Sequence, residues 1–293
     1  MKEAALILFM RMLALLPLGW ARALGKGCGW LCWVLNTRMA QTTQTNLALC
    51  FPTMTQTERE RLAKASLSNT VQAIFEAGAV WLWPAAKTLA LVTEVEGLGL
   101  LQTKLAMGKG VIVLGPHVGN WEVIGLYLGV CGCGPSSQLY QAPRAAPRVG
   151  KIIYDARSRS GAHMVNTDAK GVAELLKTLR RGEIVGILPD QVPPDSGGEF
   201  APFFGHPALT MTLLNRLQQK TGAQVVMGYV QRIAGGFRIV FREPAEGILS
   251  DDLAVALAAM NKTVEMAAVA VPEQYQWEYK RFKRQPDGVL PPY

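Results

Sequence analysis

The sequence has few of the residues that build metal centres or disulfide frameworks. Its 293 residues contain three histidines and five cysteines, an odd number that cannot pair completely. The cysteines lie in apolar or glycine-rich surroundings, and none has the spacing from a histidine that a zinc site requires. This usage favours reduced thiols in a cytosol-facing protein. We therefore predict no metal ion and no other cofactor.

Charged residues are also scarce, at 18% of the chain against 49% hydrophobic residues. The mean hydropathy of +0.15 exceeds that of an ordinary soluble protein but is far below that of a polytopic one. Lys and Arg number 30 and Asp and Glu 22, an excess that favours phosphate, anionic lipid or an acidic protein as partner. Dense basic runs interleaved with aromatic residues are missing, so we predict no nucleic-acid partner.

One long apolar stretch occurs, over residues 4–21. Its length just allows a bilayer span, whereas Arg11 in its middle favours a helix that lies in the membrane interface, and both alternatives stay open. No small-residue cleavage site follows, which argues against a cleaved signal peptide. The following stretch, 20–35, carries three tryptophans with Arg22 and Lys26, a mixture typical of the lipid headgroup boundary.

Beyond this stretch, short β-type runs alternate with helical periodicity, which predicts an α/β fold with a largely parallel central sheet flanked by helices. We expect a membrane-anchoring segment over 1–35 and one catalytic domain over 36–293. Helices are predicted over 57–83, 120–130, 147–159, 168–181, 209–221 and 250–269. Strands are predicted over 111–115, 137–140, 163–165, 184–188, 224–230 and 237–241, the last two forming a hairpin.

The most informative motif, VIVLGPHVGNWE, follows a buried-strand pattern with a histidine and a helix start capped by Asn120. His117 and Glu122 would point about 140° apart within one helix, so they meet only if His117 lies in the preceding turn. A carboxylate bound to one imidazole nitrogen raises the basicity of the other, which can then deprotonate a hydroxyl. We predict His117 as the catalytic base and Glu122 as its orienting acid.

Spacing alone is weak evidence, because an acid five residues after a histidine is expected about 0.2 times by chance in this composition. His163 and Asp168 have the same spacing. Asp168 directly precedes a helical pattern and is predicted as its N-cap, and His163 opens an apolar run, so a structural role covers both. No G-x-S-x-G elbow occurs, which argues against a mechanism with a covalent intermediate on a serine.

Several motifs together resemble the late acyltransferases of lipid A biosynthesis, within the wider His-x4-Asp/Glu glycerolipid acyltransferases. The resemblance covers about residues 46–286 in order. It rests on TNLALCFP, GPHVGNWE, RSRSG, GILPDQ, APFFG and VPEQYQWEYKRFKRQP. It maps the base and its acidic partner onto His117 and Glu122.

The resemblance implies an enzyme of the bacterial inner membrane with its catalytic domain facing the cytoplasm. Such an enzyme moves a fatty acyl group from acyl carrier protein to a hydroxyl of a hydroxyacyl chain on a phosphorylated lipid A precursor. Substrate-binding roles are predicted for Asn120, Arg157, Arg159 and Asp190. The guanidinium of Arg159, together with that of Arg157, would hold a phosphate or the developing oxyanion, with Asp190 orienting it.

Three alternatives stay open at this point. The acceptor is either a lipid A precursor or another glycolipid or amino-acid lipid, and a non-catalytic membrane lipid-binding protein would use the His–Glu pair only structurally. Phe203 and Phe204 either shape the substrate groove or belong to the core. The basic tail, 280–284, has three candidate partners: the phosphorylated lipid, the anionic leaflet and the carrier protein.

Overall fold

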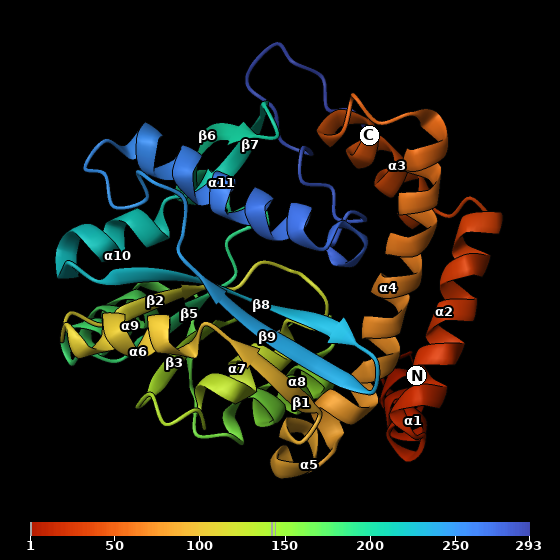
Figure 1. Ribbon diagram of the computed structural model, residues 1–293, viewed down its shortest axis with the longest axis horizontal. Coiled ribbons are helices and arrows are strands. Elements are labelled where there is room, and N and C mark those ends of the chain that lie inside the picture. The colour runs from red at the N-terminus through yellow and green to blue at the C-terminus, as the bar shows by residue number, and fades with distance from the viewer. Residues whose placement is uncertain (1, 142, 144) are drawn as a thin grey trace.

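The computed structural model describes residues 2–141, 143 and 145–293, and its centre is a seven-stranded sheet with helices on both faces (Figure 1). The strand order is β1-β9-β8-β2-β5-β3-β4, and neighbours are parallel except for the β8–β9 hairpin. The strands are β1 (Val92–Glu96), β2 (Val111–Leu114), β3 (Ser136–Tyr140), β4 (His163–Asn166), β5 (Ile184–Ile187), β8 (Gln224–Ile233) and β9 (Gly236–Arg242). The predicted α/β class, the largely parallel sheet and the closing hairpin are confirmed.

The six predicted helices form within four residues of their expected bounds, and three further helices, over 38–50, 85–89 and 98–106, were not predicted. They are α1 (Lys2–Leu15), α2 (Leu18–Val34), α3 (Arg38–Cys50), α4 (Gln56–Leu82), α5 (Ala85–Leu89), α6 (Leu98–Ala106), α7 (Glu122–Leu128), α8 (Pro147–Ser158), α9 (Ala169–Arg180), α10 (Leu213–Thr221) and α11 (Leu253–Ala270). Asp168 caps α9 by accepting a hydrogen bond from the backbone N–H of Gly171, as predicted.

The central strands are hydrophobic throughout because both faces of the sheet are covered. All four residues of β2 are buried. On one face they pack with side chains of α9, α10 and α11, and on the other with side chains of α6, α7 and the end of α4. The loop that contains His117 follows β2 directly, so it lies among packed elements.

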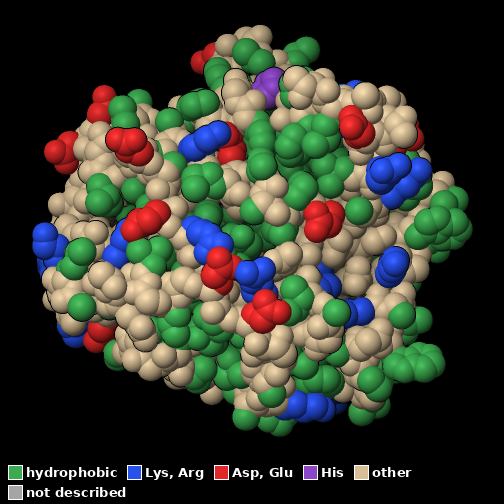
Figure 2. Space-filling model, in the orientation of Figure 1, with side chains coloured by type: hydrophobic (Ala, Val, Ile, Leu, Met, Phe, Trp, Pro, Cys, Tyr) green, Lys and Arg blue, Asp and Glu red, His purple; other side chains and the backbone are tan. Residues whose placement is uncertain are grey.

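The apolar N-terminal stretch is not one continuous anchor helix. The chain breaks at Pro17 into α1 and α2, and both pack along α4. The remaining sides of α1 and α2 expose large apolar side chains, such as Trp20 at 68% and Leu15 at 84%. Figure 2 shows hydrophobic side chains protruding at its right-hand edge, where Figure 1 places α2. By length and composition, α11 is the one helix among the described residues suited to crossing a membrane, and half of its apolar window is buried.

The predicted helix over 209–221 begins four residues later than expected, because the preceding residues form a second, two-stranded sheet. In this sheet β6 (Gly198–Phe203) pairs antiparallel with β7 (His206–Met211). The turn between them places Phe204 at a φ of 48°. Phe203 is buried in the core with Trp277 and Phe282, so the core alternative holds for Phe203, and Phe204 packs against the same cluster.

Candidate active site

The loop between β2 and α7, residues 115–121, presents His117 at the end of the central strand. Gly119 adopts a φ of +58°, and a Cβ atom there would lie 2.0 Å from the carbonyl oxygen of Val230, so only glycine fits. The C-terminal segment pins the loop. Gly119 N donates to Gln274 O at 2.8 Å, and Gln276 N donates to His117 O at 3.1 Å. The position of the imidazole is therefore fixed by main-chain contacts.

The acid bound to His117 is Asp190, which follows the neighbouring strand β5. The Nδ1 atom of His117 lies 2.7 Å from Oδ1 of Asp190, and the backbone N–H of His117 donates to Oδ2 at 2.9 Å. Burial acts to raise the pKa of Asp190, but the charge and hydrogen bonds of His117 hold it below its usual value. An ionised Asp190 accepts a hydrogen bond from Nδ1–H, so the lone pair of the neutral imidazole lies on Nε2.

The Nε2 atom of His117 faces the side-chain amide of Gln191. The two nitrogens are 3.2 Å apart, and the same amide group donates to Oε1 of Gln276 at 3.3 Å. The rings of His117 and Trp121 lie 4.6 Å apart. The Nε2 atom of His117 therefore lies next to the Gln191 amide, and the imidazole lies next to the Trp121 ring.

Glu122, the predicted orienting acid, is bound by Arg157 instead. As the first residue of α7 it accepts hydrogen bonds from Arg157 Nε at 2.8 Å and Nη2 at 2.5 Å, a bidentate pair. Burial acts to raise the pKa of Glu122, yet the adjacent Arg157 guanidinium keeps it below its usual value. The structure therefore brings Glu122 and Arg157 together beside His117, and gives the imidazole contact to Asp190.

Two other predicted substrate-binding side chains are engaged with the protein. Arg159 donates to the main-chain oxygens of Trp81 at 2.9 Å and Val80 at 2.5 Å, at the C-terminal end of α4. There the guanidinium satisfies carbonyls that lack helical partners. Asn120 Nδ2 donates to Glu76 Oε2 at 2.9 Å in the interior. Both contacts hold the framework of the site.

An apolar cavity of about 330 Å³ adjoins this loop. Its wall is formed mainly by α1 and α4, including Phe9, Ala73 and Ala77, and Trp121 and Glu122 also line it. An apolar group of a ligand fits such a wall, and the few polar side chains among the lining can orient it. The cavity therefore suits a ligand with a long apolar part, next to the loop that contains His117.

Glu278 is a further acid that lines this cavity, and sequence reasoning did not single it out. Its carboxylate accepts a hydrogen bond from the hydroxyl of Thr70 at 2.9 Å. Burial raises the pKa of Glu278, in contrast to the lowered pKa of Glu122 and Asp190. The site thus contains two acids whose pKa is lowered by cationic or imidazole partners and one whose pKa is raised by burial.

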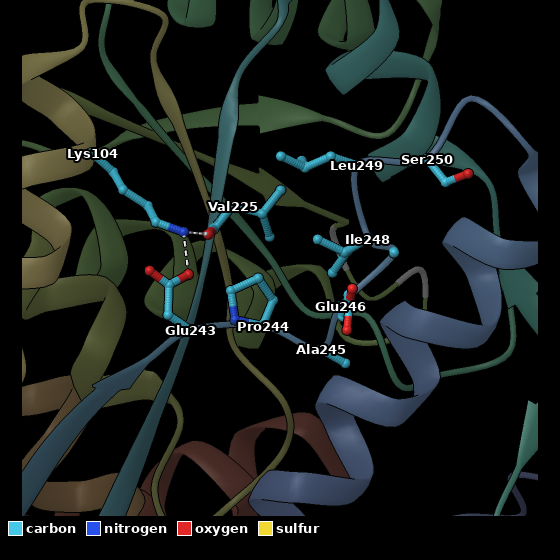
Figure 3. Close-up of a pocket in the computed structure, with 10 residues that line it drawn as sticks. Lys104, Val225, Glu243, Pro244, Ala245, Glu246, Ile248, Leu249 and Ser250 are labelled. Atoms are coloured by element: carbon cyan, nitrogen blue, oxygen red, sulfur yellow. Dashed lines mark hydrogen bonds and ion pairs between the residues drawn. The ribbon is translucent and has the colours of Figure 1, made fainter.

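A second cavity, of about 360 Å³, lies near the N-terminal ends of the parallel strands β2 and β8, and Figure 3 shows the residues that line it. There Lys104 donates to the main-chain oxygen of Val225 at 2.9 Å and pairs with Glu243. Val225 pairs with Ile112 near the start of β2, whereas His117 follows the end of β2. Since sites in parallel sheets form at the carboxyl ends of strands, the first cavity is the candidate active site.

Comparison with known proteins identifies the family of this chain. A family model described as "Bacterial lipid A biosynthesis acyltransferase" matches residues 2–284. The lipid A biosynthesis lauroyltransferase of Escherichia coli K12 is 30% identical over 269 residues, 91% of this chain and 86% of that protein. The palmitoleoyltransferase and the myristoyltransferase of the same organism are 31% and 25% identical, over 83% and 85% of this chain and 78% and 76% of their own lengths. The chain belongs to the bacterial lipid A biosynthesis acyltransferase family.

Proposed function

We propose that this enzyme transfers a fatty acyl group from acyl carrier protein to a hydroxyl of a hydroxyacyl chain on a phosphorylated lipid A precursor. The observation that carries the proposal is the His117 imidazole, bound to Asp190 through Nδ1, in a loop whose residues Asn120 and Trp121 line an apolar cavity. An excess of 30 basic over 22 acidic residues suits an acidic carrier protein and a phosphorylated acceptor.

The proposed reaction is a direct transfer. His117 Nε2 takes the proton of the acceptor hydroxyl as its oxygen attacks the thioester carbonyl. The tetrahedral intermediate collapses with loss of the carrier thiolate, which takes the proton back from His117. Asp190 stabilises the imidazolium formed in between. Gln191 supplies an amide N–H near the reacting carbonyl, where it can donate to the oxyanion.

We propose that Glu122 acts through Arg157. The Glu122 carboxylate lines the cavity and holds the guanidinium next to it, where we propose that Arg157 binds a carbonyl or phosphate oxygen of the substrate. Only 20% of the Arg157 side chain and 10% of the Glu122 side chain are exposed, so the pair forms in a largely water-excluded position.

Replacement of Glu122 by glutamine, and of Arg157 by methionine, tests this role. Each change leaves a buried partner unpaired, which costs about 3 kcal/mol of stability and misplaces the loop, so we expect turnover about 10²-fold lower in both. The double variant should lose little more than either single one. Multiplied losses in transfer assays would instead show that Glu122 acts separately from Arg157.

The apolar cavity is proposed to hold the donor acyl chain. Ala73 lies on its α4 wall, so a phenylalanine there shortens the space available to the chain. For Ala73→Phe we expect at least about a tenfold shift in kcat/KM toward shorter acyl donors, measured with carrier proteins loaded with chains of different length. Ala86→Leu, an exposed position on α5, is the matched control. An unchanged chain-length profile would place the acyl chain elsewhere.

We propose that the enzyme lies on the cytoplasmic face of the inner membrane through α1 and α2. Trp20 and Trp30 are 68% and 61% exposed on α2, as expected for side chains at a headgroup boundary. With 14 residues, α1 is about 21 Å long and shorter than the roughly 30 Å of a hydrocarbon core. Lys26 and Arg38, next to this surface, suit an anionic leaflet. The proposed division keeps 1–35 as the anchor and 36–293 as the catalytic domain.

The direct test of the proposed function is mass spectrometry of lipid A from cells that lack the protein. We expect lipid A from these cells to lack one secondary acyl group, and we expect expression of the wild-type protein to restore it. The mass difference gives the length of that acyl group. Lipid A that is unchanged in cells without a second enzyme of this specificity would contradict a lipid A acceptor. Transfer of radiolabelled acyl groups to a panel of glycolipids and amino-acid lipids would then identify the acceptor.

A further inference from the structure

A buried carboxylate on α4, that of Glu76, joins parts of the molecule that are distant in sequence. It accepts hydrogen bonds from Arg22 Nε at 2.6 Å, from Arg232 Nε and Nη2 at 2.7 and 2.9 Å, and from Asn120 Nδ2 at 2.9 Å. The residue is 0% exposed. Burial acts to raise its pKa, but the charges and hydrogen bonds of Arg232, Arg22 and Asn120 hold the pKa below its usual value. Both oxygens therefore bind as a charged group.

Arg22 fixes α2 to the end of the β8–β9 hairpin as well as to Glu76. Its Nη1 and Nη2 atoms donate to the main-chain oxygens of Ile233 and Gly236, both at 2.8 Å. Figure 1 shows this end of the hairpin beside α4, with α2 along the outer side of α4. The Arg22 guanidinium thus uses three of its nitrogens to connect α2, α4 and the hairpin.

Asn120 connects the same carboxylate to the active site. It lies three residues after His117 and directly before Trp121, in the loop that presents the imidazole. Its main-chain oxygen accepts from Val123 N at 3.1 Å, at the start of α7. The hydrogen bond to Glu76 therefore sets the orientation of the loop between the base and the helix that carries Glu122.

Helix α2 sits close against α4 because two glycines face it. A Cβ atom on Gly29 would lie 2.5 Å from the Cα atom of Ser68, and one on Gly25 would lie 2.8 Å from the Cα atom of Gln72. Such small-residue contacts allow two helices to approach closely. The same helix exposes Trp20 and Trp30 on its outer side, so α2 carries the proposed membrane surface and the contact to Glu76 together.

We propose that Glu76 is a positioning residue that couples the packing of α2 against α4 to the geometry of the catalytic loop. While α2 is packed against α4, Arg22 and Arg232 hold the carboxylate where Asn120 can bind it. Displacement of α2 removes one of the two cations, so Oε1 of Glu76 loses the Arg22 hydrogen bond and the carboxylate that Asn120 binds is held less firmly. This inference rests on the acyl transfer proposed above. It adds that a lipid surface that keeps α2 packed against α4 raises turnover.

The first test compares Glu76→Gln, Arg22→Met and Gly29→Leu in the full-length chain, with acyl carrier protein as donor and the acceptor in vesicles. The Gly29 change forces α2 away from α4 at a position remote from the site. We expect each variant to lower kcat by about tenfold or more, with KM changed less than threefold. The matched control, Glu60→Gln, is on the same helix outside this cluster and should keep wild-type kcat. Wild-type kcat in Arg22→Met and Gly29→Leu would overturn the coupling.

A second test asks whether Arg22 and Asn120 act through Glu76. In the wild-type background, Arg22→Met and Asn120→Ala combined should lower kcat little more than the larger single loss. In the Glu76→Gln background, neither change should add a loss beyond about twofold. Losses that multiply in the wild-type background would show independent roles and overturn the proposal. If Glu76→Gln fails to fold, the wild-type half of this comparison still decides.

Hydrogen exchange supplies a readout that needs no activity. We expect the backbone amides of residues 117–124 to exchange at least about tenfold faster in Arg22→Met than in wild type, and at the wild-type rate in Glu60→Gln. Unchanged protection of this segment in Arg22→Met would overturn the coupling. A wild-type enzyme without acyl transfer, but with the expected exchange pattern, would contradict the proposed function and leave the coupling supported.

Discussion

Replacing His117 with alanine is expected to lower acyl transfer by about 10³-fold or more, because the variant has no group to take the proton of the acceptor hydroxyl. Main-chain atoms make the hydrogen bonds that join this loop to residues 274–276, so these contacts remain after the change. The residue is 6% exposed, and its Nδ1 atom is bound to Asp190. Turnover with saturating acyl carrier protein and acceptor is the measurement, with circular dichroism to confirm the fold.

The matched control is His163→Ala. His163 begins β4 and is exposed, so this variant should transfer acyl groups at the wild-type rate. A His117→Ala enzyme with near wild-type turnover would contradict the role of the imidazole as base, whatever the acceptor proves to be.

Replacing Asp190 with asparagine is expected to lower kcat by about 10³- to 10⁴-fold with a small change in KM. An amide in this position can present an N–H to Nδ1, which favours the tautomer with the proton on Nε2 and removes the lone pair that the reaction needs. The loss of the carboxylate charge also destabilises the imidazolium formed during transfer. Steady-state kinetics over the acceptor concentration separate the two parameters.

Asp168→Asn provides the same chemical change outside the site. Asp168 caps α9, and asparagine caps helices about as well, so stability and turnover should both be retained. If Asp190→Asn kept kcat within threefold of wild type while Glu122→Gln abolished it, the orienting acid would be Glu122, as the His-x4-Glu spacing alone suggested.

The sequence predicts well where His117 lies, because a hydrophobic strand followed by Gly115-Pro116 and a helix start is a local pattern. The residue that binds its imidazole is not local. Asp190 is 73 positions away, and it meets His117 only because β5 pairs with β2 in register. Parallel pairing of these two strands cannot be derived from the spacing of apolar residues, so the nearest acid in sequence, Glu122, was favoured.

The roles of the arginines differ from the prediction for a related reason. Arg157 and Arg159 are two residues apart at the end of α8, so they point in different directions. Arg157 reaches Glu122 at the cavity, whereas Arg159 reaches the last carbonyls of α4. A guanidinium at a helix end has unpaired carbonyl oxygens close by, and sequence alone does not show which helix end lies within reach.

The missed β6–β7 sheet also has a physical explanation. Its residues include Pro202 and Pro207, which lack a backbone N–H and weaken the alternation expected of a strand. The two prolines face each other across the pair at positions 202 and 207. The chain turns between them at Phe204 and Gly205, both with positive φ, a feature that is seldom assigned to phenylalanine.

The contacts of residues 274–276 with the loop that carries His117 have a consequence for biosynthesis. A ribosome makes this segment more than 150 residues after the loop, so the hydrogen bonds to Gly119 N and His117 O form later in synthesis than β2 and the loop themselves. The contacts of His117 with Asp190 and of Asn120 with Glu76 involve residues that are made earlier. The full set of contacts around the imidazole is therefore completed late in synthesis.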